Sequence, residues 1–186
     1  MEDLLKEFAQ IFKQNDSLGQ LEYSHISINT SESPLPLSGQ IQLFYQSLKF
    51  EEPCYFTGGS ADMALVPLSQ LEKMLEGWQS DWREGYIIFA YLMGDDIVFC
   101  DSNYSACPVY GRITGWTQTY ALAPSLEKFL ILYSQIKKLQ IEQFEGQVYD
   151  DETDDLKNGY LDRVDEMIGI HLSEDYREDF KSFMID

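Results

Sequence analysis

Short apolar runs separated by turn residues fill the middle of the chain. Two runs rich in Ile, Val, Phe and Tyr flank Met93-Gly94-Asp95-Asp96. A short Gly-Asp segment between two such runs is typical of a β-hairpin. We predict consecutive antiparallel strands over residues 86–92, 97–101, 109–113 and 119–122, with shorter extended pieces at 53–59 and 63–68 and an ambiguous one at 21–29.

Apolar residues recur at three- and four-residue steps on both sides of these strands, which indicates helices. Asp3 is the expected cap of the first helix, and Pro124-Ser125 begins the longest one. The predicted helices cover residues 3–13, 37–49, 69–77 and 125–139. Helices first, a central antiparallel sheet and a long closing helix packed on it define an α+β fold.

The character of the chain changes after residue 141. Residues 142–155 carry seven acids and no base, which suits a linker, a solvated loop or a recognition surface. Two helical patterns follow, one from Leu156 to Ile168 and one from Ser173, and their aromatic residues need burial. We therefore expect an α+β domain over 1–141 and, over 142–186, an acidic linker with a helical extension packed on the main body.

The formal net charge is −19. Residues 142–186 hold 15 acidic and 4 basic side chains, so more than half of the excess lies in the last quarter of the chain. A field of this sign repels nucleic acid and attracts a basic protein partner, although acidity also serves solubility alone. The chain has no apolar run long enough for a membrane span and an acidic start unlike a signal peptide, so we expect a cytoplasmic protein.

The inventory of reactive residues predicts no catalytic residue, no metal site and no cofactor. The three cysteines, Cys54, Cys100 and Cys107, lack metal-ligand spacing and are expected to be reduced structural thiols. A nucleophilic thiol would need His25 or His171 as its base. Adjacent carboxylates leave acid–base or divalent-metal chemistry open by inventory, although the acidic stretch fails the calcium-loop pattern.

The candidate partner-binding residues are loop tryptophans and acids. Tryptophans anchor many protein interfaces, although each of these can instead cap the core. Asp95 and Asp96 are turn formers first and interface residues second. The full set is Trp78, Trp82, Asp95, Asp96, Trp116, Asp150, Asp151, Glu152, Asp154 and Asp155.

The order of these signals over residues 35–138 resembles the SUKH superfamily, which includes fungal regulators of cell-wall assembly and bacterial immunity proteins. Members carry an early proline segment and an aromatic pair in a helix, then a Gly turn, a strand pair around Gly-Asp, a Pro-Val-Tyr strand and a serine-led closing helix. The corresponding segments here are Leu35-Pro36-Leu37, Phe44-Tyr45, Gly58-Gly59, Leu65-Val66-Pro67-Leu68, Ile87 to Ala90, Gly94 to Asp101, Pro108-Val109-Tyr110 and Ser125 to Leu130.

The resemblance implies a non-enzymatic protein-binding module. The leading expectation is an immunity protein that neutralises a cognate bacterial toxin by tight stoichiometric binding, with a basic toxin domain such as a nuclease as partner. The second is a regulatory scaffold similar to the fungal relative. The third is a hydrolase or metal-dependent enzyme.

Overall fold

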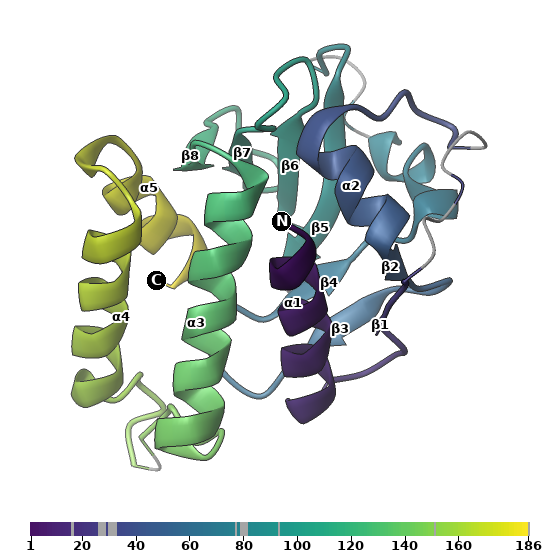
Figure 1. Cartoon of the computed structure of the whole chain (residues 1–186). Coiled ribbons are helices and arrows are strands. Elements are labelled where there is room, and N and C mark those ends of the chain that lie inside the picture. Colours follow the sequence, from purple (N-terminus) through teal and green to yellow (C-terminus); the bar gives the residue numbers. More distant parts are fainter. Residues whose placement is uncertain are drawn as a thin grey trace.

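The computed structural model describes residues 1–15, 17–25, 29, 33–76, 78, 82–92, 94–150 and 152–185 of the 186-residue chain (Figure 1). Within these residues, five α-helices accompany a six-stranded antiparallel sheet and a two-stranded sheet. The predicted α+β class is confirmed.

The main sheet is a meander in which each strand pairs with its neighbours in sequence. Its strands are β3 (Cys54–Phe56), β4 (Met63–Leu65), β5 (Tyr86–Leu92), β6 (Ile97–Asp101), β7 (Val109–Arg112) and β8 (Tyr120–Ala123). The small sheet pairs β1 (Glu22–Tyr23) with β2 (Leu48–Lys49). Strands β5 and β6 have the predicted bounds, because their apolar runs end at the Gly-Asp turn.

Helices cover one face of the main sheet (Figure 1). The helices are α1 (Glu2–Gln14), α2 (Gly39–Ser47), α3 (Leu126–Phe144), α4 (Asn158–His171) and α5 (Glu174–Met184), of which α4 packs on α3 and α5. The Ser125 side chain caps α3 by accepting a hydrogen bond of 3.1 Å from the Lys128 N–H. Helix α3 crosses the sheet between α1 and the C-terminal pair α4 and α5 (Figure 1).

Two local predictions are wrong. The helix expected over 69–77 is instead two 3₁₀ turns, η1 (Leu68–Gln70) and η2 (Lys73–Leu75), a form common where a segment is too short for a stable α-helix. Asp3 lies in the first turn of α1, because the helix begins at Glu2 and Met1 is its cap. Of the ambiguous segment 21–29, only β1 is a strand among the described residues.

The division expected between residues 141 and 142 falls inside α3, which continues to Phe144. One core cluster joins residues on both sides of it, including Phe8, Phe129, Tyr160 and Phe180. The rings of Phe129 and Phe180 lie 6.2 Å apart between centroids. Helices α4 and α5 therefore pack on the body of the protein and complete its core.

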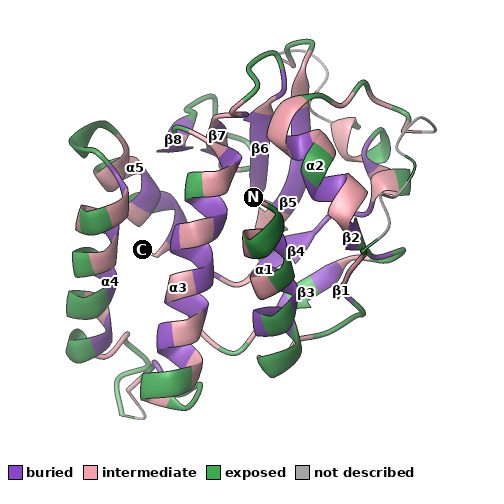
Figure 2. Ribbon diagram, viewed as in Figure 1, coloured by how far each residue is buried: buried purple, intermediate pink, exposed green. Residues whose placement is uncertain are grey.

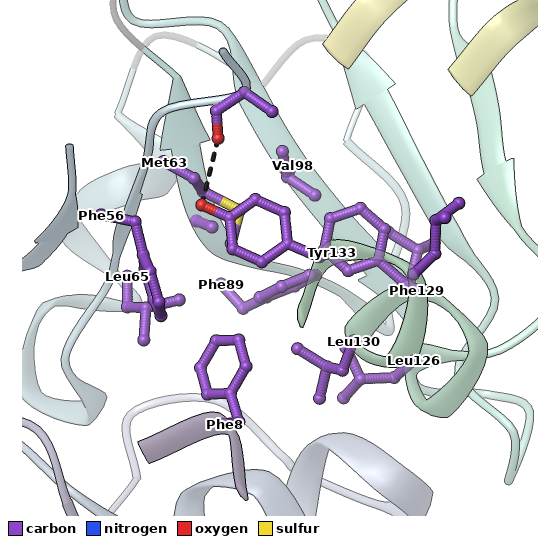
Figure 3. Close-up of a cluster of buried hydrophobic side chains, with 14 of the residues drawn as sticks. Phe8, Phe56, Met63, Leu65, Phe89, Val98, Leu126, Phe129, Leu130 and Tyr133 are labelled. Carbon is purple, nitrogen blue, oxygen red and sulfur yellow. Dashed lines mark hydrogen bonds between the residues drawn. The ribbon is translucent and has the colours of Figure 1, made fainter. Parts of the chain in front are cut away.

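The main core lies between the helices and the sheet (Figure 2). Phe8 of α1 packs between aromatic residues of the strands and of α3, with its ring 5.0 Å from that of Phe56 and 6.3 Å from that of Tyr133 (Figure 3). Aromatic side chains bury large apolar areas, so this contact fixes α1 and α3 on the same face of the sheet.

A smaller cluster of Ile88, Ile97 and Phe99 lies on the opposite face of the sheet. Trp78 and Trp82 pack against it, with the Trp82 ring 5.0 Å from that of Phe99. The segment that carries η1, η2 and these tryptophans therefore covers part of the second face.

Replacing Gly111 by alanine tests the docking of α5. A Cβ at Gly111 would lie 2.5 Å from the Phe183 ring, so we expect Gly111→Ala to lower the free energy of unfolding by about 1–3 kcal/mol. Gly169→Ala in α4 is the control, because its Cβ meets open space and should raise stability by about 0.5–1 kcal/mol. Urea unfolding measures both. Equal stability of Gly111→Ala and the parent protein would contradict the packing of α5 on β7.

Candidate functional site

Three turns and one loop gather at one end of the main sheet. Successive turns on the same side of an antiparallel meander fall at the same end. Gly146 and Tyr149 of the loop after α3 line a hollow together with residues of the β3–β4 turn. We call this region the turn end. It comprises the β3–β4 turn (57–62), the β5–β6 turn (94–96), the β7–β8 turn (113–119) and the α3–α4 loop (145–157).

Two hydrogen bonds join the β5–β6 turn to the β7–β8 turn. The Thr114 N–H donates to Oδ1 of Asp96 at 2.8 Å, and the Thr114 hydroxyl donates to the Asp95 carbonyl at 2.7 Å. The Trp116 side chain is 56% exposed on the second of these turns. The structure thus brings together Asp95, Asp96 and Trp116, three of the predicted partner-binding residues.

The acidic α3–α4 loop has a defined fold. Tyr149 and Leu156 form an isolated antiparallel bridge, and the Asp150 carboxylate accepts hydrogen bonds from the N–H groups of Glu152 and Thr153 at 2.9 and 3.2 Å. These contacts leave Glu152, Asp154 and Asp155 exposed. Asp151 lies outside the described residues. Residues 142–144, expected to begin the linker, are instead the last residues of α3.

A buried lysine lies beneath the β3–β4 turn. The Lys137 ammonium donates to Oδ1 of Asp62 at 2.8 Å and to the Ser60 carbonyl at 3.0 Å. Lys137 is fully buried, whereas the Asp62 side chain is 19% exposed. Burial lowers the pKa of Lys137, and the charge of Asp62 opposes this shift.

Other side chains of α3 and α4 hold the same turn. Tyr133 donates its hydroxyl to the Ala61 carbonyl at 3.0 Å (Figure 3), and Gln140 donates its amide to the Gly58 carbonyl at 2.8 Å. The hydroxyls of Ser60 and Tyr160 are hydrogen-bonded to each other. A side chain at Gly59 would displace the Gln140 amide, because a Cβ there would lie 1.3 Å from the amide nitrogen.

Two hollows open beside this turn and share Asp62 and Leu92. The turn-end hollow, of about 630 Å³, is lined by Gly58, Gly59, Ala61, Asp62, Leu92, Gly146, Tyr149 and Met184. The smaller one, which we call the tyrosine slot, has about 230 Å³ and is lined by Tyr55, Phe56, Thr57, Asp62, Met63, Ala64, Tyr91, Leu92, Gly94 and Asp95.

Sequence reasoning missed Asp62, Lys137, Tyr55 and Tyr91. One signal for Lys137 was available, since it follows Tyr133 by four residues and so lies on the apolar stripe of α3. A lysine on a stripe that faces a sheet requires a buried acceptor.

Trp78 and Trp82 do not belong to the turn end. The Trp82 indole donates to the Tyr86 carbonyl at 3.0 Å, and the Arg112 guanidinium lies 5.7 Å from the centre of the Trp78 ring. Both tryptophans are half-buried on the second face of the sheet. Their packing fits the alternative that they cap a core cluster.

The three cysteines are free and buried. A hydrogen bond from Cys100 lowers the pKa of the Cys107 thiol to about 7, and burial raises that of Cys54 to about 11. His171 is bonded to Gln135 at 2.8 Å, and the His25 ring lies 5.2 Å from that of Tyr23. Within the described part of the chain, no group of three or more potential ligands is placed to hold a metal, and no helix is long and apolar enough to cross a membrane.

Removing either partner of the Lys137–Asp62 pair tests the buried charge. We expect Asp62→Asn to cost about 3–5 kcal/mol at neutral pH, because it leaves a buried ammonium without its counter-charge. Lys137→Met should cost less, about 1–2 kcal/mol, because water can reach the Asp62 carboxylate. Urea unfolding measures the two variants.

The pH dependence of the stability of the same two variants distinguishes an effect of the buried charge from an effect of packing. The pKa of Lys137 is below its ordinary value of 10.5, so the unfolded state binds more protons just below pH 10.5 and stability rises with pH there. Asp62→Asn removes the charge that opposes this shift, so relative to Lys137→Met this variant should regain stability as the pH rises toward 10.5. Parallel pH profiles for the two variants would contradict a buried charge at Lys137.

Comparison with protein-family models, with curated proteins and with solved structures finds no match to this chain. The resemblance to the SUKH superfamily therefore stays a prediction that rests on the order of the motifs.

Proposed function

We propose that this chain is a non-catalytic protein-binding module that docks its turn end on a basic surface of a partner protein. The observation that carries the proposal is the convergence of exposed acids and an exposed tryptophan on connected turns. Exposed Asp95, half-buried Asp96 and exposed Trp116 lie on two turns that hydrogen bonds join. The acidic α3–α4 loop adjoins the same end through Tyr149 and Gly146, which line the turn-end hollow.

Acids outnumber bases among the described residues of this end. Lys137 is buried and engaged by Asp62, and the Lys157 ammonium donates to the Gln147 carbonyl at 2.7 Å. Exposed carboxylates on one rigid surface raise the rate at which a basic partner is captured, and they do so most strongly at low salt. The neighbouring β3–β4 turn is held by buried hydrogen bonds, and a preorganised surface of this kind loses little conformational entropy on binding.

The most specific form of the proposal is an immunity protein that neutralises a basic toxin domain, such as a nuclease, by stoichiometric binding. The order of the SUKH-like motifs and the net charge of −19 support it. In this form the acidic turn end covers the basic surface that the toxin uses on its own substrate.

The immunity form predicts a toxin gene beside this one, and co-expression with its toxin domain tests that form. We expect rescue of growth and a 1:1 complex on size-exclusion chromatography. Toxicity that persists with both proteins soluble, together with separate elution, would overturn it. Binding to several host proteins and to no toxin would favour the regulatory scaffold instead.

A charge-matched pair of variants tests the surface. Glu152→Gln/Asp154→Asn/Asp155→Asn removes three exposed acids from the turn end, and Glu72→Gln/Glu76→Gln/Glu84→Gln removes three exposed acids elsewhere. The first variant should slow association with the toxin about ten-fold at low salt, with a smaller effect in about 0.5 M salt. Surface plasmon resonance measures the rates. Equal slowing by both variants would point to net charge alone and contradict a defined docking end.

A further inference from the structure

We propose that the tyrosine slot receives one arginine side chain of the partner. This inference rests on the proposed binding of a basic protein and assigns one contact within it. The slot lies between the ends of three strands and two turns, with tyrosines and carboxylates among its lining residues.

Cross-strand register builds the aromatic wall of the slot. Tyr55, Ala64 and Tyr91 are direct partners on β3, β4 and β5, so their side chains share one face of the sheet. The two tyrosine rings meet edge to face at 6.2 Å between centroids, and their hydroxyls are 2.9 Å apart. Ala64 between them is small and leaves room beside the rings. The wall is therefore preorganised by its own hydrogen bond.

Carboxylates from both turns line the same slot. Asp62 contributes from the β3–β4 turn and Asp95 from the β5–β6 turn. Lys137 engages Oδ1 of Asp62, and a carboxylate accepts hydrogen bonds on both oxygens. Burial, the hydrogen bond with Tyr55 and the nearby charge of Asp95 all raise the pKa of Tyr91, so its hydroxyl stays neutral. Aromatic faces beside carboxylates form a site for a cation.

The size of the slot argues for a single side chain. Its volume of about 230 Å³ is below the about 300–1,000 Å³ typical of small-molecule sites. Tyr55 is 39% exposed, so the slot is open to a partner. Arginine suits it better than lysine, because a planar guanidinium stacks on a ring while it donates two hydrogen bonds to a carboxylate.

One positive charge lies farther along the same face. Arg112 pairs with Ile97, which pairs with Tyr91, so Arg112 is two strands away. Its guanidinium donates to the Thr119 hydroxyl at 3.1 Å and lies against Trp78. Arg112 is thus engaged outside the slot.

Titration of the full-length, ¹⁵N-labelled protein with N-acetyl-arginine amide tests the slot without any partner. We expect saturable shifts at the amides of Tyr55, Ala64, Tyr91 and Asp95, with a Kd of about 1–10 mM. The neutral isostere N-acetyl-citrulline amide should bind at least about five-fold more weakly. Equal shifts with citrulline, shifts confined to the acidic loop, or no saturation by about 50 mM would overturn the proposal. Equal binding of N-acetyl-lysine amide would overturn the choice of arginine.

Variants locate the site. Asp95→Asn removes the charge and is compatible with the left-handed backbone there (φ 66°), so it should keep the fold and weaken binding at least about three-fold. Ala64→Leu should fill the slot and abolish binding, and Tyr91→Leu should do so by removing one aromatic wall. Glu84→Gln, an exposed change outside the slot, is the control and should bind as the parent does. Unchanged binding by Asp95→Asn and Tyr91→Leu would overturn the assignment.

The experiments can reject the arginine-binding slot and the protein-binding function independently of each other. A toxin complex that forms equally well with Tyr91→Leu, with no arginine binding, would remove the slot and keep the protein-binding function. Specific arginine binding without any basic protein partner would keep the slot and remove that function.

Discussion

The ammonium of Lys137 is the constraint on which the rest of the turn end depends. A buried charge is tolerated only where it is paired and hydrogen-bonded, and here the partners come from the β3–β4 turn. That requirement fixes α3 against the turn in one register. Tyr133 and Gln140 then reach the carbonyls of Ala61 and Gly58. The turn-end hollow and the tyrosine slot both open beside this turn, and both are lined by Asp62.

The C-terminal helices share in this arrangement. Tyr160 of α4 is hydrogen-bonded to Ser60 in the same turn, and its ring packs 5.3 Å from that of Phe144 at the end of α3. The turn is thus contacted from α3 and from α4, although the two helices are separated by an acidic loop. Residues after 141 therefore shape the candidate site directly and do not merely add charge beside it.

The sequence predicts those elements whose local signals agree with their packing. Strands β5 and β6 combine β-branched and aromatic residues with a Gly-Asp turn, and α3 combines an apolar stripe with the Ser125 cap. The end of α3 was missed because a change in charge after residue 141 does not stop a helix, and glutamate and glutamine are good helix formers.

The site itself was harder to predict, because its residues carry no distinctive local pattern when each is taken alone. The acids of the β5–β6 turn and of the α3–α4 loop could be selected from composition, as could Trp116. The meeting of Asp95 with Asp62, Tyr55 and Tyr91 depends on strand register, which no local pattern encodes. Trp78 and Trp82 carry the same local signal as Trp116, but the second face of the sheet covers their rings. The burial of the ring, which depends on the fold, distinguishes Trp78 and Trp82 from Trp116.

Both edges of the main sheet are protected, and this bears on how a partner is recognised. Tyr55 of β3 exchanges backbone hydrogen bonds with Leu18 at 2.8 and 2.9 Å, and the Ala121 N–H of β8 donates to the Asp179 carboxylate at 2.7 Å. An incoming strand would have to displace these contacts, which disfavours recognition by strand addition. Recognition of a partner through side chains at the turn end is therefore favoured over strand addition. In the proposed complex, the acidic loop accelerates encounter over a long range, while the tyrosine slot supplies short-range selectivity for one cation.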